Sequence, residues 1–175
     1  MSHFGAKVEY ALHTLLNIAI ADPGAAPSSR ELAEFQRLPL AFVRKLLTEQ
    51  QRAGLLRAAE GRRGGWQLAR DASRISMLDV ADAAQGRVPL FDCRDVRTRC
   101  AMWEDTTVPA AARRGVCEIH AVMQQAEAAM RARLAAVSLA DLRDRVGRKS
   151  PAWVHEAAPR WFAVQARRRG PGTAA

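Results

Sequence analysis

Three cysteines and one histidine are the residues of this sequence best suited to metal or redox chemistry. Cys93 and Cys100 are seven positions apart, Cys117 follows 17 positions later, and His120 lies three positions beyond Cys117. A zinc site would normally contain a closely spaced pair of cysteines, and this sequence has none. Iron–sulfur clusters are held mainly by cysteine thiolates, which histidine can replace. The spacing therefore suits an iron–sulfur cluster better than zinc, and three free cysteines, some of them buried, are the alternative.

The same residues allow two other chemistries. Cys93 and Cys100 could form a disulfide or react with an oxidant, which would make them a thiol switch. Cys117 could act as a nucleophile with His120 as its base, but the two share one predicted helix and have no orienting third group or oxyanion donors. We therefore do not expect an enzyme. Since the cysteine count is odd, structural disulfides are also a poor explanation.

The elements that must position these residues begin with three predicted helices. Apolar residues at helical spacing predict the first helix over residues 4–20. Ser28 followed by Glu31 is a capping-box pattern and indicates the start of a short second helix. Pro39 is a favourable first-turn residue for a third helix, which Gly54 is expected to end.

The sequence period then changes to that of a β-hairpin. Residues 55–58 and 66–69 are short strand-like runs, joined by the glycine-rich, basic residues 59–65. Ser76 and Asp79 then indicate the start of a further helix. Three helices followed by a basic hairpin is the order of a winged helix-turn-helix, in which the third helix enters the major groove of DNA.

We therefore expect a mostly α-helical protein with a small β-hairpin wing, divided into four parts. Residues 1–86 form the winged helix-turn-helix DNA-binding domain, and residues 87–116 form a cysteine-containing loop. Residues 117–147 contain a long amphipathic helix whose apolar stripe needs a partner surface, most simply a second copy of the chain. The basic, proline-containing residues 148–175 are expected to form a flexible tail.

Composition limits the partners and the compartment. The chain of 175 residues has 27 Lys and Arg against 18 Asp and Glu, a net charge of +9 that favours nucleic acid as partner. Aromatic residues make up only 6%, which argues against a stacking platform for single strands or RNA. No apolar run approaches the ~18 residues of a membrane span, and charged residues interrupt the N-terminal apolar stretch. We expect a cytoplasmic protein with no membrane partner.

Seven residues in the predicted domain are candidates for contact with double-stranded DNA. Two arginines at the tip of the hairpin suit a phosphate or the minor groove, and two basic residues lie early in the third helix. The remaining three open the second helix, where backbone N–H groups can meet a phosphate. In chain order the seven are Ser28, Ser29, Arg30, Arg44, Lys45, Arg62 and Arg63.

Taken together, these features resemble the iron–sulfur-sensing winged-helix repressors, the family that includes IscR, NsrR and RsrR. The resemblance covers residues 1–147 and rests on VEYALH at 8–13, GRRGGWQL at 61–68, the cysteine loop and SLADL at 138–142. It implies a homodimeric bacterial transcription factor, a repressor whose cluster state alters its binding to a palindromic DNA operator.

The resemblance also implies two alternative ligand sets for a [2Fe–2S] cluster. In the branch closest to RsrR, which we prefer, the motif VEYALH supplies Glu9 and His13 to one iron, and Cys93 and Cys117 of the partner subunit hold the other. Glu9 and His13 are four positions apart and share a helix face, although a core histidine paired with Glu9 would give the same pattern. The other set is local and consists of Cys93, Cys100, Cys117 and His120.

Overall fold

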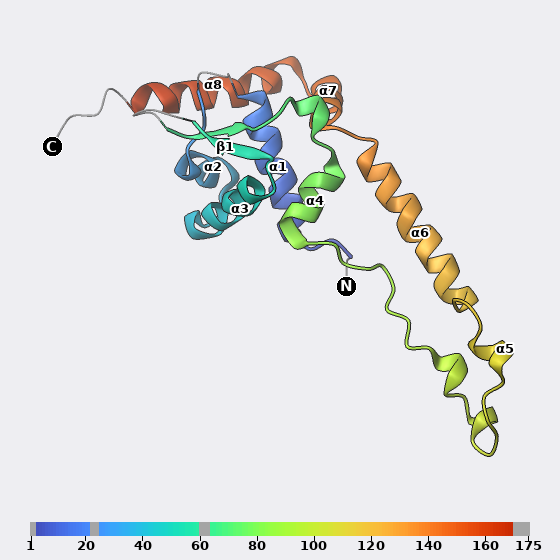
Figure 1. Ribbon diagram of the computed structural model, residues 1–175. Coiled ribbons are helices and arrows are strands. Elements are labelled where there is room, and N and C mark those ends of the chain that lie inside the picture. The colour runs from blue at the N-terminus through green and yellow to red at the C-terminus, as the bar shows by residue number, and fades with distance from the viewer. Residues whose placement is uncertain (1–2, 22–24, 60–63, 170–175) are drawn as a thin grey trace. The chain divides into compact units, whose positions relative to one another are not determined.

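The computed structural model describes residues 3–21, 25–59 and 64–169. The chain divides into two compact units (Figure 1). The first contains the described residues up to Gly86 and those from Leu134 onward, and the second runs from Arg87 to Arg133. Each unit is described by itself.

The first unit is mainly helical and carries one two-stranded antiparallel hairpin. In the hairpin Leu56 lies opposite Leu68 and Ala58 lies opposite Trp66. The expected mostly helical fold with a small β-hairpin is confirmed. The elements are α1 (Ala6–Ile20), α2 (Ser29–Gln36), α3 (Leu40–Arg52), β1 (Leu56–Ala58), β2 (Trp66–Leu68), the short helix η1 (Ala72–Arg74), α4 (Met77–Gln85), α7 (Leu139–Lys149) and α8 (Ala152–Arg168).

Capping boxes begin α2 and α4 where the sequence predicts them. The Ser28 hydroxyl accepts the Glu31 backbone N–H at 3.2 Å, and the Glu31 carboxylate accepts the Ser28 backbone N–H at 2.8 Å. Ser76 and Asp79 form the same reciprocal pair at α4. Each box satisfies two backbone donors that a helix start leaves without intrahelical partners, which fixes where the helix begins.

A single apolar core holds the helix-turn-helix pair against α1. Ala11 and Leu15 of α1, Leu32 of α2, Leu46 of α3 and Val80 of α4 all have 0% exposed surface. Burial of apolar surface stabilises the fold by roughly 25 cal/mol for each Å² removed from water. One face of α1 therefore packs against α2, α3 and α4.

The hairpin is fastened to the start of α2. Trp66 donates its backbone N–H to the Pro27 carbonyl at 2.9 Å, and its indole N–H to the Ser29 hydroxyl at 2.9 Å. A Cβ atom at Gly65 would lie 1.8 Å from the Ala26 carbonyl oxygen, so only glycine allows this close approach. The base of the wing is thus held in place by the loop that precedes α2.

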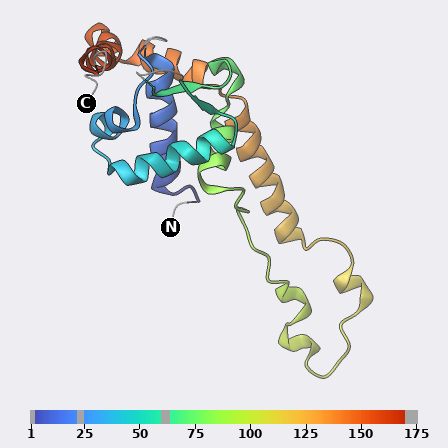
Figure 2. The ribbon, with the colours of Figure 1, turned by 60° about the vertical axis from the view of Figure 1, so that its left-hand side comes forward.

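Residues 152–168 form the helix α8, so the expectation of a flexible tail is wrong for them. Phe162 is only 1% exposed, and its ring centroid lies 4.9 Å from that of Phe35 in α2. Trp161 contacts the same Phe35 ring at 5.1 Å. Pro159 lies inside this helix and cannot donate a backbone hydrogen bond. The free energy gained by the aromatic packing compensates for that loss. Figures 1 and 2 both show the end of α8 beside α2.

The second unit contains short helical turns and most of α6. Its elements are η2 (Val96–Thr98), η3 (Ala101–Trp103), α5 (Ala110–Arg113) and α6 (Glu118–Ala135), whose last turn enters the first unit. The start of the cysteine-containing loop is held to α6, because Leu90 donates its backbone N–H to the Glu127 carboxylate at 3.0 Å. Ile119 and Val122 of α6 are 67% and 60% exposed. Among the described residues, no helix is long and apolar enough to cross a membrane.

Candidate nucleic-acid interface and metal centre

The candidate DNA-binding residues that the structure describes lie around α2 and α3. A hollow of about 820 Å³ in the first unit brings together Ser28, Ser29 and Arg30 at the start of α2 with Arg44 of α3. Lys45 is exposed on α3 beside Arg44. Arg62 and Arg63, expected at the tip of the wing, lie outside the described residues.

The basic side chains of this surface are open to a polyanion. Arg30, Arg44 and Lys45 are all exposed. Within the described part of the chain, none of the three takes part in an ion pair. Their positive charge is therefore available to the phosphate backbone, which supplies much of the affinity in protein–DNA complexes.

Glu9 and His13 line a second hollow of the first unit, about 420 Å³ in volume. They lie one turn apart on the exposed face of α1, and the other walls include the apolar side chains of Leu12, Leu16 and Leu142. Across residues 3–21, 25–59 and 64–169, neither Glu9 nor His13 has a hydrogen bond or ion pair. His13 is therefore not a core histidine paired with Glu9. Two side chains able to bind a metal stand open at the rim of an apolar surface.

The three cysteines lie in the second unit, and all are unbridged and partly exposed. Their hydrogen bonds separate two of them. The Cys93 sulfur accepts the backbone N–H of Asp95 at 3.4 Å, whereas the Cys100 thiol donates to the Val96 carbonyl at 3.2 Å. A donating thiol must carry its proton, while an accepting sulfur is free to be a thiolate, the form that binds metals. Cys93 is thus better prepared as a ligand than Cys100, a distinction that sequence spacing could not reveal.

Arg97 ties together the two arms of the cysteine loop. Its guanidinium donates to Asp95 at 3.0 Å on the arm of Cys93, and to the Gly115 carbonyl at 2.7 Å on the arm of Cys117. The hydrogen bond from Arg97 is the main cause that lowers the pKa of Asp95 below its ordinary value. Cys117 directly precedes α6, and its carbonyl accepts the backbone N–H of Ala121 at 2.8 Å, as in the first turn of a helix. Sequence reasoning did not identify Arg97 as the residue that connects these two parts of the loop.

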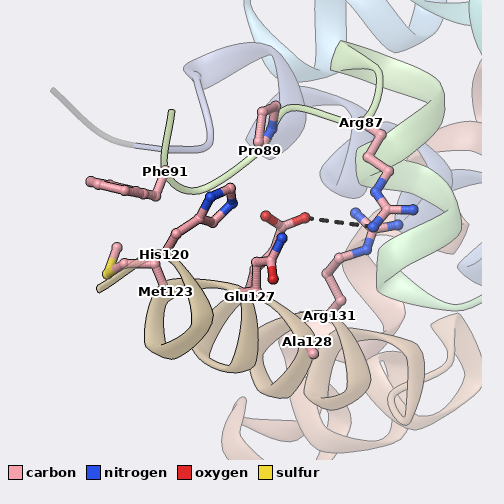
Figure 3. Close-up of a pocket in the computed structure, with 9 residues that line it drawn as sticks. Arg87, Pro89, Phe91, His120, Met123, Glu127, Ala128 and Arg131 are labelled. Atoms are coloured by element: carbon pink, nitrogen blue, oxygen red, sulfur yellow. Dashed lines mark ion pairs between the residues drawn. The ribbon is translucent and has the colours of Figure 1, made fainter. Parts of the chain in front are cut away.

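His120 projects from α6 into a third hollow, of about 440 Å³, in the second unit (Figure 3). Its ring contacts Phe91 edge-on at 6.0 Å. Glu127 projects into the same space and pairs with Arg87 at 3.8 Å. Among the described residues, no three His, Cys, Asp or Glu side chains are close enough together to hold a metal ion. Both ligand sets therefore stay predictions.

The fold and the basic surface agree with the match to a known family. The sequence model of Rrf2, described as an iron-dependent transcriptional regulator, matches residues 4–145. The chain belongs to the Rrf2 family. The match includes α1, the helix-turn-helix pair, the hairpin and the cysteine loop, and it ends within α7.

Individual relatives of this Rrf2 protein are transcriptional regulators. A Mycobacterium tuberculosis protein named as an HTH-type transcriptional regulator is 36% identical over 91 residues, which are 52% of this chain and 55% of the relative. The chain thus spans little more than half the length of that relative. The transcriptional repressor NsrR of Streptomyces coelicolor is 27% identical over 135 residues, which are 77% of this chain and 83% of NsrR.

Solved structures share the fold of this Rrf2 protein. IscR of T. potens superposes with a TM-score of 0.62 at 19% identity and covers 88% of this chain and 96% of its own. CymR, the global cysteine regulator of B. subtilis, has a TM-score of 0.58 at 19% identity, with 83% and 98% covered. The family and the relatives are described as transcriptional regulators, which gives no support to the alternative of an enzyme that uses Cys117 and His120.

Proposed function

We propose that this Rrf2 regulator is a homodimeric, cytoplasmic repressor whose binding to a pseudo-palindromic DNA operator is controlled by a [2Fe–2S] cluster. The observation that carries the proposal is the open pair of Glu9 and His13, because both are metal-binding side chains without a protein partner in the described chain. Family membership supports it through the description of an iron-dependent regulator.

The proposed ligands are Glu9 and His13 of one subunit with Cys93 and Cys117 of the partner subunit. A carboxylate, an imidazole and two thiolates provide the four ligands that two iron atoms need besides their bridging sulfides. The Asp95 N–H on the Cys93 sulfur adds a hydrogen bond of the kind that adjusts a cluster's potential. When bound, the cluster would supply a centre that gains and loses one electron.

Glu9 and His13 lie on α1, the helix that packs directly against the DNA-binding helices, so a change at these residues can move those helices. They lie on the exposed face of α1, whereas Ala11 and Leu15 of the same helix are buried against the helix-turn-helix core. Lys7 of α1 also pairs with Glu49 of α3 at 2.7 Å. A small movement of α1 would therefore displace α3, the helix expected to enter the major groove. We infer that ligand exchange at Glu9 or His13 alters operator affinity by this route.

The dimer is proposed from the exposed apolar stripe of α6. Ile119 and Val122 are more than half exposed, and apolar residues of this size on one helix face are typical of an interface. A two-fold dimer would present two recognition helices to two half-sites, which predicts a pseudo-palindromic operator.

The experiment that tests this function is metal analysis of protein purified without oxygen. We expect a coloured protein with about two iron and two sulfide per chain, and an affinity for its operator that changes when the cluster is lost. A colourless protein whose DNA binding responds to oxidant, and stops responding in Cys100→Ser, would contradict the proposal. That result would support the thiol switch of Cys93 and Cys100.

A further inference from the structure

The C-terminal helix is part of the DNA-binding unit, although the Rrf2 match ends at residue 145. Phe162 buries its ring against Phe35 of α2, the first helix of the helix-turn-helix pair. Ala166, one turn further, also packs against the core. The last turn of α8 then reaches the start of α2 and the turn end of the hairpin.

Arg169, directly after α8, fastens this end of the helix to three segments. Its Nη2 donates to the carbonyls of Ala25 and Ala26 at 2.6 and 3.2 Å, and its Nη1 donates to the Gly64 carbonyl at 3.0 Å. Its Nε lies 2.9 Å from Oε1 of Glu31, a residue that is 6% exposed. One guanidinium thus joins the loop before α2, α2 itself and the hairpin turn at Gly64.

The contact with Arg169 also changes the charge of the DNA-binding surface. Glu31 lies at the start of α2, where an unpaired carboxylate would repel a phosphate. Arg169 neutralises it, which leaves Glu34 as the other acidic residue of the 820 Å³ hollow. Arginine binds both a carboxylate and carbonyl groups well because its planar fork presents several donors at once.

The contacts of Arg169 hold the end of α8 so that the neighbouring Arg168 lines the 820 Å³ hollow. It is exposed and lines the same surface as Arg30 and Arg44. Within the described residues it takes part in no ion pair. Three arginines from α2, α3 and α8 therefore converge on one concave surface, which has the charge and the fork-shaped donors that suit backbone phosphates.

We propose that α8 is a further DNA-contacting element, in which Arg169 fixes the helix and Arg168 binds a backbone phosphate of the duplex held by α2 and α3. The proposal rests on the DNA-binding function and adds a contact from outside the region that matches the family. Because a phosphate carries no sequence information, Arg168 should strengthen binding to every duplex equally.

The test is the salt dependence of binding to a fluorescein-labelled duplex of about 30 base pairs of arbitrary sequence, followed by anisotropy. Arg168→Ala should reduce the slope of log K against log salt by about 0.9 and weaken binding by about 3–10-fold at 0.1 M salt. Its thermal midpoint should equal that of the wild type. Arg168→Lys should restore most of the slope, because the charge is kept.

Arg143→Ala is the matched control, since it removes the same charge from α7, where Arg143 pairs with Asp144. It should leave the slope unchanged. Arg169→Ala should lower both the thermal midpoint and the affinity, because it releases α8. An unchanged slope in Arg168→Ala would overturn the proposal and make α8 a purely stabilising helix. Failure of the wild-type protein to bind duplex at low salt would instead contradict the DNA-binding function itself.

Discussion

Cys93 and Cys100 lie on the same loop, yet their sulfur atoms make opposite hydrogen bonds. Cys93 accepts from the Asp95 backbone, and Cys100 donates to the Val96 carbonyl. A metal ligand must give up its proton, so binding at Cys93 keeps its hydrogen bond, whereas binding at Cys100 breaks one. Cys93 belongs to both proposed ligand sets, so the hydrogen bond of Cys100 is the one that favours the set without Cys100.

We expect the contribution of Asp141 to the stability of the fold to depend on pH. Asp141 lies in the first turn of α7 and forms a capping box with Ser138, the N-cap residue. The backbone N–H of Ser138, and next its hydroxyl, lower the pKa of Asp141 below its ordinary value of 3.8. Because the folded pKa is the lower one, the carboxylate stabilises the fold fully above that ordinary value. The contribution is lost as the pH falls through the folded pKa.

We therefore expect Asp141→Asn to lower the thermal midpoint at pH 7, with the difference from wild type closing as the pH falls through the lowered pKa of Asp141. Thermal unfolding followed by circular dichroism across pH would show this. Asp144→Asn, on the same helix but outside the capping box, should change the midpoint less. A difference that stays constant down to low pH would mean that the Asp141 charge is not responsible.

Residue types predicted the local structure well where one short pattern has one structural meaning. Ser28 with Glu31, and Ser76 with Asp79, indicated helix starts that the structure shows as capping boxes. Gly54 was expected to end α3 and has a positive φ of 69° just after it. The hydrogen bonds of Cys93 and Cys100 depend on loop geometry instead, which no residue pattern specifies.

Among the secondary-structure elements, α1 serves both the DNA-binding surface and the proposed cluster site. Its buried face supports α2, α3 and α4, and its exposed face carries Glu9 and His13.

The helix α8 is the element that sequence reasoning did not predict. Pro159 and the closing arginines suggested a tail, but the four-residue spacing of Val154, Ala158, Phe162 and Ala166 was a helical signal. Tertiary packing outweighed the local cost of proline.

The apolar stripe of α6 gives a prediction about assembly. Replacing Ile119 and Val122 together by Glu should give monomers that bind DNA poorly, because two charges would be buried at the dimer contact. Mass measured by light scattering would show this. Gln125→Glu with Ala132→Glu adds the same two charges at exposed positions of α6 away from the stripe and should leave the dimer intact. Dimers that persist in the first variant would indicate another interface.

Each of the two units of the chain carries one half of the preferred ligand set. Glu9 and His13 belong to the first unit, and Cys93 and Cys117 to the second. A ligand set shared between subunits would therefore link the assembly of the dimer to the cluster and, through α1, to the DNA-binding surface. Neither the sequence nor one chain could establish such a site, because it is complete only between two copies.

Iron and sulfide analysis, with the visible spectrum, of two single variants purified without oxygen tests the proposed ligand set. We predict that His13→Ala loses the cluster or changes its spectrum, because an iron that lacks one ligand is open to water and exchange. Cys100→Ser should keep both. Since His13 is exposed, its loss should leave the fold intact by circular dichroism. If Cys100→Ser bleaches the protein while His13→Ala does not, the claim is contradicted, and the ligands are Cys93, Cys100, Cys117 and His120.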